Sequence, residues 1–501
     1  MWSLLVTTAL LLLVHQASAF CPPDCDCNDE TLVVTCKEAN LDVIPITLNP
    51  SIQRLVLKYN RIKTVDSAIQ FYSSLQHVDL SHNQLVNIPI RGFEPQEKLV
   101  ELQLNHNKLS SVNNKTFIGL KSLKVLNLRG NFLEDLPDRL FAPLSHLEEL
   151  DLGQNRISRI DQACFEGLTA LRILYLDDNQ LRSVPTPSFT YLGMLAELRV
   201  GLNVFTTLAD GAFNGLGRLS ALDLRGAGLT NISDNAFRGL SGLRSLVLTD
   251  NRLQSIPTKQ LSKLTRLEEL EIGQNGFSML EAGCFKGLSY LKRLEITGAS
   301  NLTRVRKGAF ADNLNLETLT LNKNPKLKTI EEGALVGLPN LYHLNLKENA
   351  FTSFSESMLA WPELRTIDIA ENPIECGCNI LWLREMLVRR NTSAVFCNSP
   401  APLKYKSLIS LSAEDLGCAF NDARKQAIIG AVCGTTVAII AIICLLLYKY
   451  RHRLQGALKD YKWNKRAMSR KEHEYQKTFS DDEFIMRTQQ QNMKPIPVTE
   501  L

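Results

Sequence analysis

The sequence predicts an α/β solenoid: a horseshoe whose concave side is a parallel β-sheet, with disulfide caps at both ends and one transmembrane helix after it. Three observations support this prediction. A leucine pattern recurs about every 24 residues over residues 51–374, cysteines cluster on both sides of that stretch, and residues 427–448 form an uncharged run. A repeat of this length cannot bury its apolar face alone, so neighbouring copies must stack.

One copy of the repeat runs from Leu147 to Ile157 and has the pattern L-x-x-L-x-L-x-x-N-x-I. Leu150 and Leu152 alternate with period two, which predicts a short strand with both leucines on its buried face. Asn155 follows where the chain turns, and its amide can bond backbone groups that have left the strand. The second apolar position of the pattern recurs about fourteen times, at Leu55, Val78, Leu102, Leu126, Leu150, Leu174, Leu198, Leu222, Leu246, Leu270, Leu294, Leu319, Leu344 and Ile367.

The other half of each repeat carries a large apolar residue in register, which predicts a buried aromatic spine. Cys164 and Cys284 occupy the small-residue slot beside it, five repeats or about 24 Å apart, so we expect buried thiols that cannot bridge each other; an intermolecular disulfide is the alternative. Ala227 and Ala299 replace the asparagine, and an irregular strand ladder is expected near Ala299, where the period lengthens to 25 residues. The spine positions are Phe93, Phe117, Phe141, Phe165, Phe189, Phe213, Phe237, Leu261, Phe285, Phe310, Leu335 and Leu359.

The two ends of the array differ from the repeats. Residues 1–19 end in Ala-Ser-Ala after an apolar run, which predicts a secretory signal peptide; a membrane anchor is the alternative. Export implies an oxidising compartment, so the flanking cysteines are expected in disulfides. Residues 21–50 carry C-x3-C-x-C-x8-C and should form an N-terminal cap, with a zinc site as the competing interpretation. Residues 375–418 should form the C-terminal cap, with a helix beginning at Trp382 and Leu383.

The cysteine clusters around 24-residue repeats, together with the motif N-P-x-x-C-x-C-x3-W-L that begins at Asn372, resemble the extracellular leucine-rich repeat family, as in Slit, Trk and Toll-type ectodomains. The resemblance covers residues 21–418 and implies a single-pass cell-surface receptor or adhesion protein. It also implies four disulfides, which spacing alone does not establish because four cysteines allow three connectivities. The implied pairs are Cys21–Cys27, Cys25–Cys36, Cys376–Cys397 and Cys378–Cys418.

Residues 427–448 contain no charge over a length that spans a bilayer, and residues 419–426 are expected to be a juxtamembrane linker. A dense run of Lys and Arg begins at Lys449, while few precede the segment, so the positive-inside rule predicts a cytoplasmic C-terminus. Residues 449–501 are a short polar tail that we expect to be disordered alone. The predicted location is therefore the plasma membrane, as a type I single-pass protein with its N-terminus outside.

The residues between the leucines of each strand should point outward from the concave sheet. Ten of them are acidic and three are basic, so we expect an electronegative surface that repels nucleic acid and suits a protein ligand with a basic or mixed surface. Tyr175 could serve as an aromatic anchor. A merely solvated face is the alternative. The acidic positions are Asp79, Glu101, Glu149, Asp151, Glu197, Asp223, Glu269, Glu271, Glu295 and Asp368, against Arg54, Arg199 and Arg293.

Several short motifs predict modification or association. N-glycosylation sequons occur at Asn114, Asn231, Asn301 and Asn391. Gly430 and Gly434 form a G-x-x-x-G pattern that favours helix dimerisation, with lipid-facing glycine as the alternative. Thr499 and Leu501 in the terminal Val-Thr-Glu-Leu resemble a class I PDZ ligand, which binds by adding a strand to a sheet edge.

The net charge of +4 on 501 residues favours neither a nucleic-acid binder nor a disordered chain, and the eight histidines are scattered without a nucleophile beside them. We therefore predict no enzyme, no cofactor and no metal. The leading hypothesis is a cell-surface protein that binds an extracellular protein, in adhesion or as a co-receptor, and couples to a cytoplasmic PDZ scaffold. The alternative is a receptor that a ligand dimerises and that recruits effectors through its tail; an innate immune sensor ranks third.

Overall fold

The structure is a computed structural model that describes residues 20–390, 395–451, 456, 458–459 and 461–466. It consists of two units, Met1–Ser412 and Ala413–Leu501. The predicted signal peptide, the sequon at Asn391 and the terminal PDZ motif lie outside the described residues.

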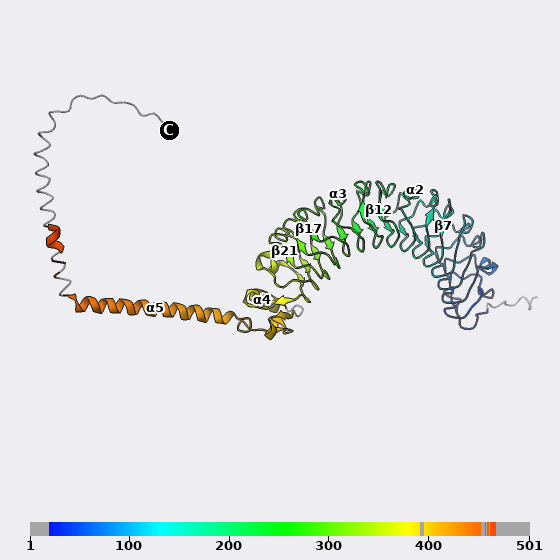
Figure 1. Ribbon diagram of the computed structural model, residues 1–501. Coiled ribbons are helices and arrows are strands. Elements are labelled where there is room, and N and C mark those ends of the chain that lie inside the picture. Colours follow the sequence, from blue (N-terminus) through cyan, green and yellow to red (C-terminus); the bar gives the residue numbers. More distant parts are fainter. Residues whose placement is uncertain (1–19, 391–394, 452–455, 457, 460, 467–501) are drawn as a thin grey trace, which may run out of the picture. The chain divides into compact units, whose positions relative to one another are not determined.

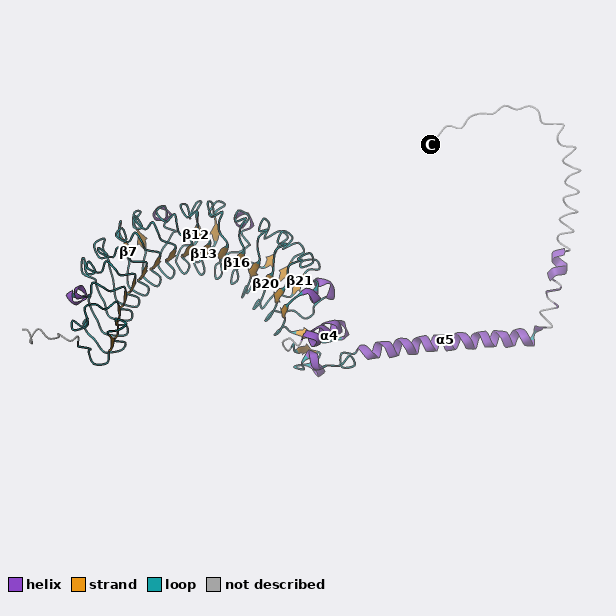
Figure 2. Ribbon diagram, turned by 180° about the vertical axis from the view of Figure 1, so that it is seen from behind, coloured by secondary structure: helices purple, strands orange, loops and turns teal. Residues whose placement is uncertain are grey.

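The first unit is a solenoid whose inner side is one parallel sheet, as predicted (Figures 1 and 2). Within the described residues, fourteen strands of this sheet belong to repeats, and the middle residue of each is one of the predicted apolar positions. Register is unbroken; for example, Leu126 pairs with Leu150, and Leu150 with Leu174. The strands are β3 (Arg54–Val56), β4 (His77–Asp79), β5 (Glu101–Gln103), β6 (Val125–Asn127), β8 (Glu149–Asp151), β10 (Ile173–Tyr175), β11 (Glu197–Arg199), β13 (Ala221–Asp223), β15 (Ser245–Val247), β16 (Glu269–Glu271), β18 (Arg293–Glu295), β20 (Thr318–Thr320), β22 (His343–Asn345) and β23 (Thr366–Asp368).

The core lies between this sheet and the outer segments. The repeat leucines and every predicted spine residue are buried. Neighbouring spine rings stack, with centroids 6.0 Å apart for Phe117 and Phe141 and 5.8 Å apart for Phe285 and Phe310. Cys164 and Cys284 are free, buried thiols, as expected. Burial disfavours the thiolate, so it raises the pKa of Cys164 and raises the pKa of Cys284 to about 12.

A ladder of buried asparagines joins each repeat to the one before it. The Asn155 amide nitrogen donates to the carbonyls of Leu152 and Leu128, both at 3.0 Å, and its oxygen accepts from the Leu133 N–H at 3.2 Å. Each such side chain therefore forms hydrogen bonds with backbone groups of two successive repeats. These bonds stabilise the solenoid because a buried polar group without a partner is energetically unfavourable. Twelve of the fourteen repeats have this asparagine buried: Asn60, Asn83, Asn107, Asn131, Asn155, Asn179, Asn203, Asn251, Asn275, Asn324, Asn349 and Asn372.

The expected irregularity of the sheet near Ala299 is wrong. Leu270, Leu294 and Leu319 pair directly across the 25-residue repeat, so the sheet continues without a shift. The extra residue changes the asparagine ladder instead. The Asn324 side-chain oxygen accepts from the N–H of Ala299, which occupies the ladder position of the preceding repeat. In a 24-residue repeat, the asparagine oxygen accepts from the N–H of the residue two positions after the preceding ladder asparagine, as Asn155 does from Leu133. The loop after the strand absorbs the insertion because the sheet hydrogen bonds resist slipping.

The outer side of the arc consists of turns, short strand pairs and short helices. The described outer strands are β7 (Asp135–Leu136), β9 (Arg159–Ile160), β12 (Thr207–Leu208), β14 (Asn231–Ile232), β17 (Met279–Leu280), β19 (Arg304–Val305) and β21 (Thr329–Ile330). The described short helices are η1 (Ser67–Phe71), α2 (Thr186–Phe189), α3 (Thr258–Leu261), η2 (Glu356–Met358) and η3 (Trp361–Glu363). Figure 1 shows β12, β17, α2 and α3 along the outer rim.

The N-terminal cap extends the concave sheet, which the sequence did not predict. Strand β1 (Asp26–Asn28) pairs antiparallel with β2 (Val33–Thr35), and β2 pairs parallel with β3. The disulfides Cys21–Cys27 and Cys25–Cys36 hold this hairpin, with the pairing that the resemblance implied. The cap thus closes the first repeat with backbone hydrogen bonds as well as cross-links.

The C-terminal cap covers the last repeat with helix α4 (Leu381–Arg390), which begins one residue before the predicted start at Trp382. The Arg390 guanidinium donates to the carbonyls of Leu364 and Trp361 at 2.6 and 2.7 Å. Cys376 bonds Cys397 as implied, and Cys378 and Cys418 are each disulfide-bonded. The remaining cap elements are β24 (Ile374–Glu375), β25 (Cys397–Ser399), η4 (Cys378–Ile380), η5 (Ala401–Leu403) and η6 (Leu408–Ser410).

The second unit contains helix α5 (Cys418–Lys449). Its stretch Gln426–Lys449 is the one helix among the described residues that is long and apolar enough to cross a membrane. It includes the predicted span 427–448. Gly430 and Gly434 lie one turn apart in it, on the same face of the helix.

Candidate functional site

The concave sheet exposes two side chains per repeat. The middle residue of each three-residue strand is buried, so the first and third residues point outward, as the alternation predicted. The predicted ligand face residues all lie in these outward rows: Glu149, Asp151, Tyr175, Glu197, Asp223, Glu269 and Glu271. The sheet therefore assembles two continuous rows of side chains from residues that are 24 apart in the sequence.

Most of the ten acidic positions on this face have partners. Three accept hydrogen bonds within their own loop: Asp223 from the Arg225 N–H, Glu295 from the Thr297 hydroxyl and Asp368 from the Ala370 N–H. Six pair with a basic side chain: Asp79 with Lys58, Glu101 with His77, Asp151 with Arg129, Glu197 with Arg199, Glu269 with Arg293 and Glu271 with Arg225. The surface is therefore less electronegative than the sequence count indicated.

The count failed because it missed a third row of residues. The position directly after the second strand leucine also reaches this surface, and it carries Lys58, Arg129, Arg225 and Lys347. The signal was present in the sequence, since these residues recur at multiples of the repeat period. A count restricted to two outward rows leaves them out.

Arg129 is the most enclosed of these basic residues. Its guanidinium donates to Asp177 at 2.8 Å and to Asp151 at 3.4 Å, so it links three successive repeats. The hydrogen bond from Arg129 to Asp177 raises the pKa of Arg129. Burial raises the pKa of the Asp151 carboxyl, and the N–H of Gly153 and the charge of Arg129 oppose that rise. Asp151, predicted as a ligand residue, is therefore a structural partner of Arg129.

Glu149 differs from the other nine acidic residues. Among the described residues, its carboxylate forms neither an ion pair nor a hydrogen bond, although the side chain is half-buried. Its neighbours on the adjacent strands are Val125 and Ile173, both apolar and half-buried. Burial raises the pKa of Glu149, and the charges of Asp151, Glu197 and Glu101 raise it further, while Arg199 lowers it.

Tyr175, the predicted aromatic anchor, is half-buried and already has a neighbour. The Arg199 guanidinium lies 4.8 Å from its ring centroid, and Arg199 also pairs with Glu197 at 2.8 Å. Burial, followed by the charge of Glu197, raises the pKa of Tyr175. These three residues form a pre-assembled cluster on β10 and β11.

Beyond this cluster the side chains become small. Ala221, Ser245 and Val247 leave a hollow of about 300 Å³ on the concave face, with Asp223 and Arg225 at its edge. Sequence reasoning did not single out these positions because it searched for charged and aromatic residues. A shallow hollow beside charged rims can accept a protruding side chain of a protein partner.

A second feature that the sequence did not predict lies at the N-terminal end of the array. The rings of Tyr59, His82 and His106 stack, with centroids 4.3 and 4.5 Å apart, and Lys37 lies 5.6 Å from the Tyr59 ring centroid. The three ring residues precede ladder asparagines and adopt left-handed backbone conformations. Burial and the neighbouring charge of His106 lower the pKa of His82.

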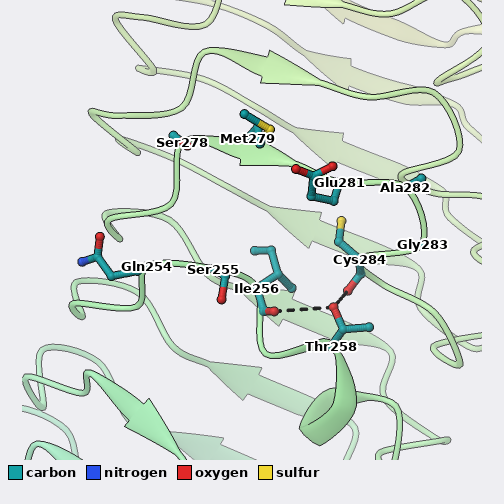
Figure 3. A pocket seen from close by; sticks show the side chains of 10 residues that line it. All are labelled: Gln254, Ser255, Ile256, Thr258, Ser278, Met279, Glu281, Ala282, Gly283 and Cys284. Carbon is teal, nitrogen blue, oxygen red and sulfur yellow. Dashed lines mark hydrogen bonds between the residues drawn. The ribbon is translucent and has the colours of Figure 1, made fainter.

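The outer surface has a separate hollow of about 350 Å³ beside Cys284 (Figure 3). Its lining is mixed and includes Met279, Glu281 and Thr258, whose hydroxyl donates to the Cys284 carbonyl at 2.8 Å. Because the thiol is buried and protonated, it is a packing residue with low reactivity.

The described sequons lie outside the concave strands. Asn231 is in β14, which pairs with β12 on the outer side. Asn114 is in an exposed loop, and Asn301, also in a loop, accepts a bond from Lys326 at 3.0 Å. Glycans at these positions would leave the inner surface open.

The profile of the family described as "Leucine rich repeat" matches overlapping stretches that together run from residue 73 to residue 374, more than half of the chain. The chain therefore belongs to the leucine-rich repeat family, and its disulfide caps agree with the resemblance seen in the sequence.

Curated relatives match over short stretches. Human reticulon-4 receptor-like 2 is 36% identical over 118 residues, which are 23% of this chain and 28% of the relative. Human lumican is 34% identical over 20% of this chain and 30% of its own length, and human leucine-rich repeat-containing protein 3B is 33% identical over 24% and 47%. The matches thus span less than half of the length of each of these relatives.

Two solved structures share the fold. A complex of TLR13 with ssRNA13 has a TM-score of 0.56 and 25% identity, covering 72% of this chain and 60% of that one. The Drosophila Toll–Spätzle complex has a TM-score of 0.53 and 19% identity, covering 73% and 61%.

Proposed function

We propose that this protein is a cell-surface leucine-rich repeat protein whose concave sheet binds another extracellular protein. The observation that carries this proposal is a continuous outward surface of fourteen repeat strands, with charged clusters and a hollow on it and with every described sequon elsewhere. Rigid strands present such residues with less conformational freedom than loops do, which favours recognition. The absence of a catalytic constellation in the sequence supports binding rather than catalysis.

The proposed topology is type I, with residues 1–19 as a signal peptide and the Gln426–Lys449 helix as the membrane span. Disulfides at both ends of the array suit an oxidising exterior, and the basic residues after the helix suit the cytoplasmic side. Epitope tags placed before Phe20 and after Arg466 test it. The first tag follows the proposed cleavage site and should be accessible to antibody on intact cells. The second tag should be accessible only after permeabilisation, and the reverse pattern would contradict the topology.

The proposed link to the cell interior is the Thr499–Leu501 motif, which would bind a PDZ scaffold by strand addition. Removal of these three residues should abolish binding of a PDZ domain and surface clustering. Thr499→Ser keeps the hydroxyl and serves as the matched control. Unchanged clustering after the deletion would contradict the coupling.

Two other functions are weaker candidates. A ligand-dimerised receptor is supported by Gly430 and Gly434 on one face of α5. A nucleic-acid sensor is disfavoured, although the TLR13 structure contains RNA, because acidic residues still outnumber basic ones in the two outward rows here.

The concave surface can be tested with a glycan wedge. Ser245→Asn with Val247→Thr creates a sequon in β15, beside the hollow. Full-length protein on cells would be screened against a collection of secreted and surface ectodomains, and the wedge should eliminate binding of the partner found. The control, Arg159→Asn with Asp161→Thr, places a glycan on the outer strand β9. Equal binding by both variants would contradict the proposal.

A further inference from the structure

Glu149 lies on β8, the fifth of the fourteen repeat strands, and its carboxylate has no partner among the described residues. The side chain is half-buried, its carboxylate oxygens still reach solvent, and the two side chains beside it in its row, Val125 and Ile173, offer no hydrogen bond. Even partial removal of a carboxylate from water is unfavourable when no hydrogen bond compensates for it. Nine of the ten acidic residues on this face have a hydrogen-bond or ion-pair partner, and Glu149 does not. Its carboxylate is therefore suited to accept a hydrogen bond from an external donor.

Two arginines of the neighbouring repeats, Arg129 and Arg199, already have other partners. Arg129 is held by Asp151 and Asp177, and Arg199 is held by Glu197 and lies over the Tyr175 ring. Each would have to break a close contact to reach Glu149. The local field therefore remains negative, with Asp151, Glu197 and Glu101 acting on this carboxyl together.

The chemistry of the missing partner follows from these neighbours. A negative site rejects phosphates and acidic side chains, and its field favours a cation over a neutral donor. Val125 and Ile173 flank the carboxylate at the strand spacing of about 4.8 Å, which gives an apolar bed for the methylene stem of Lys or Arg. Burial, followed by the charges of Asp151, Glu197 and Glu101, raises the pKa of Glu149, and a cation bound beside the carboxylate would oppose that rise.

We propose that Glu149, between Val125 and Ile173, is the anchor point for one Lys or Arg side chain of the extracellular protein that the concave sheet binds. This inference rests on the proposed function and adds the recognised chemistry and the residue that recognises it. Glu269 provides a matched comparison. It occupies the same strand position in β16, but Arg293 on the next strand is its partner.

The test uses full-length protein in lipid nanodiscs and a phage-displayed library of random peptides as the probe. Clones that bind the protein but not empty nanodiscs, and that lose binding to the glycan wedge at residues 245–247, identify ligands of the concave face. Their affinities for wild type, Glu149→Gln and Glu269→Gln are then measured. We expect peptides with a Lys or Arg whose affinity falls about tenfold or more with Glu149→Gln, and within about twofold with Glu269→Gln.

A double-mutant cycle makes the assignment specific. Replacing the peptide's basic residue with Gln should cost about as much as Glu149→Gln, and both changes together should cost little more than either alone. Concave-face peptides that bind wild type and Glu149→Gln equally, or that lack a basic residue, would overturn the inference and leave the proposed function standing. A library that yields no ligand of the concave face would count against both.

Discussion

Two regions of the concave sheet have a glutamate at the same strand position, but only one of these glutamates has an ion-pair partner. In β16, Glu269 faces Arg293 on the next strand and forms an ion pair with it. In β8, Glu149 faces Ile173 on the next strand and has no partner among the described residues. The residue one repeat further along supplies the partner in one region and not in the other, since Arg293 lies beside Glu269 and Ile173 beside Glu149.

Some charges on the concave sheet stabilise the solenoid by pairing with each other, and Glu149 has no such partner among the described residues. Across β16 and β18, Glu269 and Arg293 neutralise each other, so this carboxylate already has a cationic partner within the protein. Around β8, Arg129 is committed to Asp151 and Asp177, so Glu149 stays unmatched. Counting acidic residues on a concave face therefore overstates its affinity for basic ligands, because only an unpaired carboxylate is free to contribute.

The largest expected effect is on stability and concerns the bridge beside Glu149. Arg129→Met leaves Asp151, which is 9% exposed, with an uncompensated charge. We expect the free energy of unfolding to fall by about 3 kcal/mol, as measured by denaturant unfolding. Arg225→Met is the control, because its pair with Glu271 is exposed and should matter by less than about 1 kcal/mol. Equal losses would show that the two regions do not differ in this way.

The next substitution makes the region around β8 resemble the region around β16. Ile173→Arg places a cation beside Glu149 in the register that Arg293 has beside Glu269. The new pair should occupy the carboxylate and weaken binding of the basic peptides at least about tenfold. Surface plasmon resonance with full-length protein measures this, with Ile173→Val as the apolar control. Undiminished affinity of the Arg variant would contradict the role of Glu149.

Protonation offers a third comparison. The pKa of Glu149 is raised by burial and then by Asp151, Glu197 and Glu101, against the opposing charge of Arg199. Because a cation binds the ionised form, affinity should begin to fall at a higher pH than for an ordinary glutamate, approaching about tenfold per pH unit below that pKa. Binding measured from neutral to acidic pH checks this. A Glu149→Gln protein should lack that component, and an unaltered profile in the variant would refute the assignment.

The smallest effect concerns stability without a ligand. A raised pKa means that the protonated form of Glu149 favours the fold, a contribution lost as pH rises through the folded-state pKa. At neutral pH, Glu149→Gln should therefore stabilise the protein slightly, by about 0.5 kcal/mol or less for a partly exposed group, while Glu269→Gln should destabilise it slightly. Thermal unfolding of both variants compares the signs. Identical signs would mean that the environments are alike.

Much of the fold could be predicted because its determinants are local and periodic. The leucines at Leu150 and Leu152 indicated the strand, and the recurrence of Asn155 indicated the turn and its ladder. The spine was predicted by the same recurrence. The N-terminal hairpin was not, because its strands carry no leucine pattern and their pairing depends on the disulfides that hold them.

The sequence predicted which residues point outward from the concave sheet, but it did not predict how their charges are paired. Glu149 and Glu269 look alike in the sequence, since each is followed by leucine and a second acid. Their difference lies in Ile173 and Arg293, which become neighbours only through the sheet. The bridge from Arg129 to Asp177 joins residues two repeats apart, and the two-row count of outward positions did not include it.

The central claim, that Glu149 is unpaired and available whereas Glu269 is not, can be measured without a ligand. Folded full-length protein would be treated with a carbodiimide and glycine ethyl ester, and the extent of labelling at each carboxyl read by mass spectrometry. The prediction is that Glu149 is modified ahead of Glu269 and Asp151, which Arg293 and Arg129 hold. Labelling of Glu149 no faster than that of Glu269 would contradict the claim.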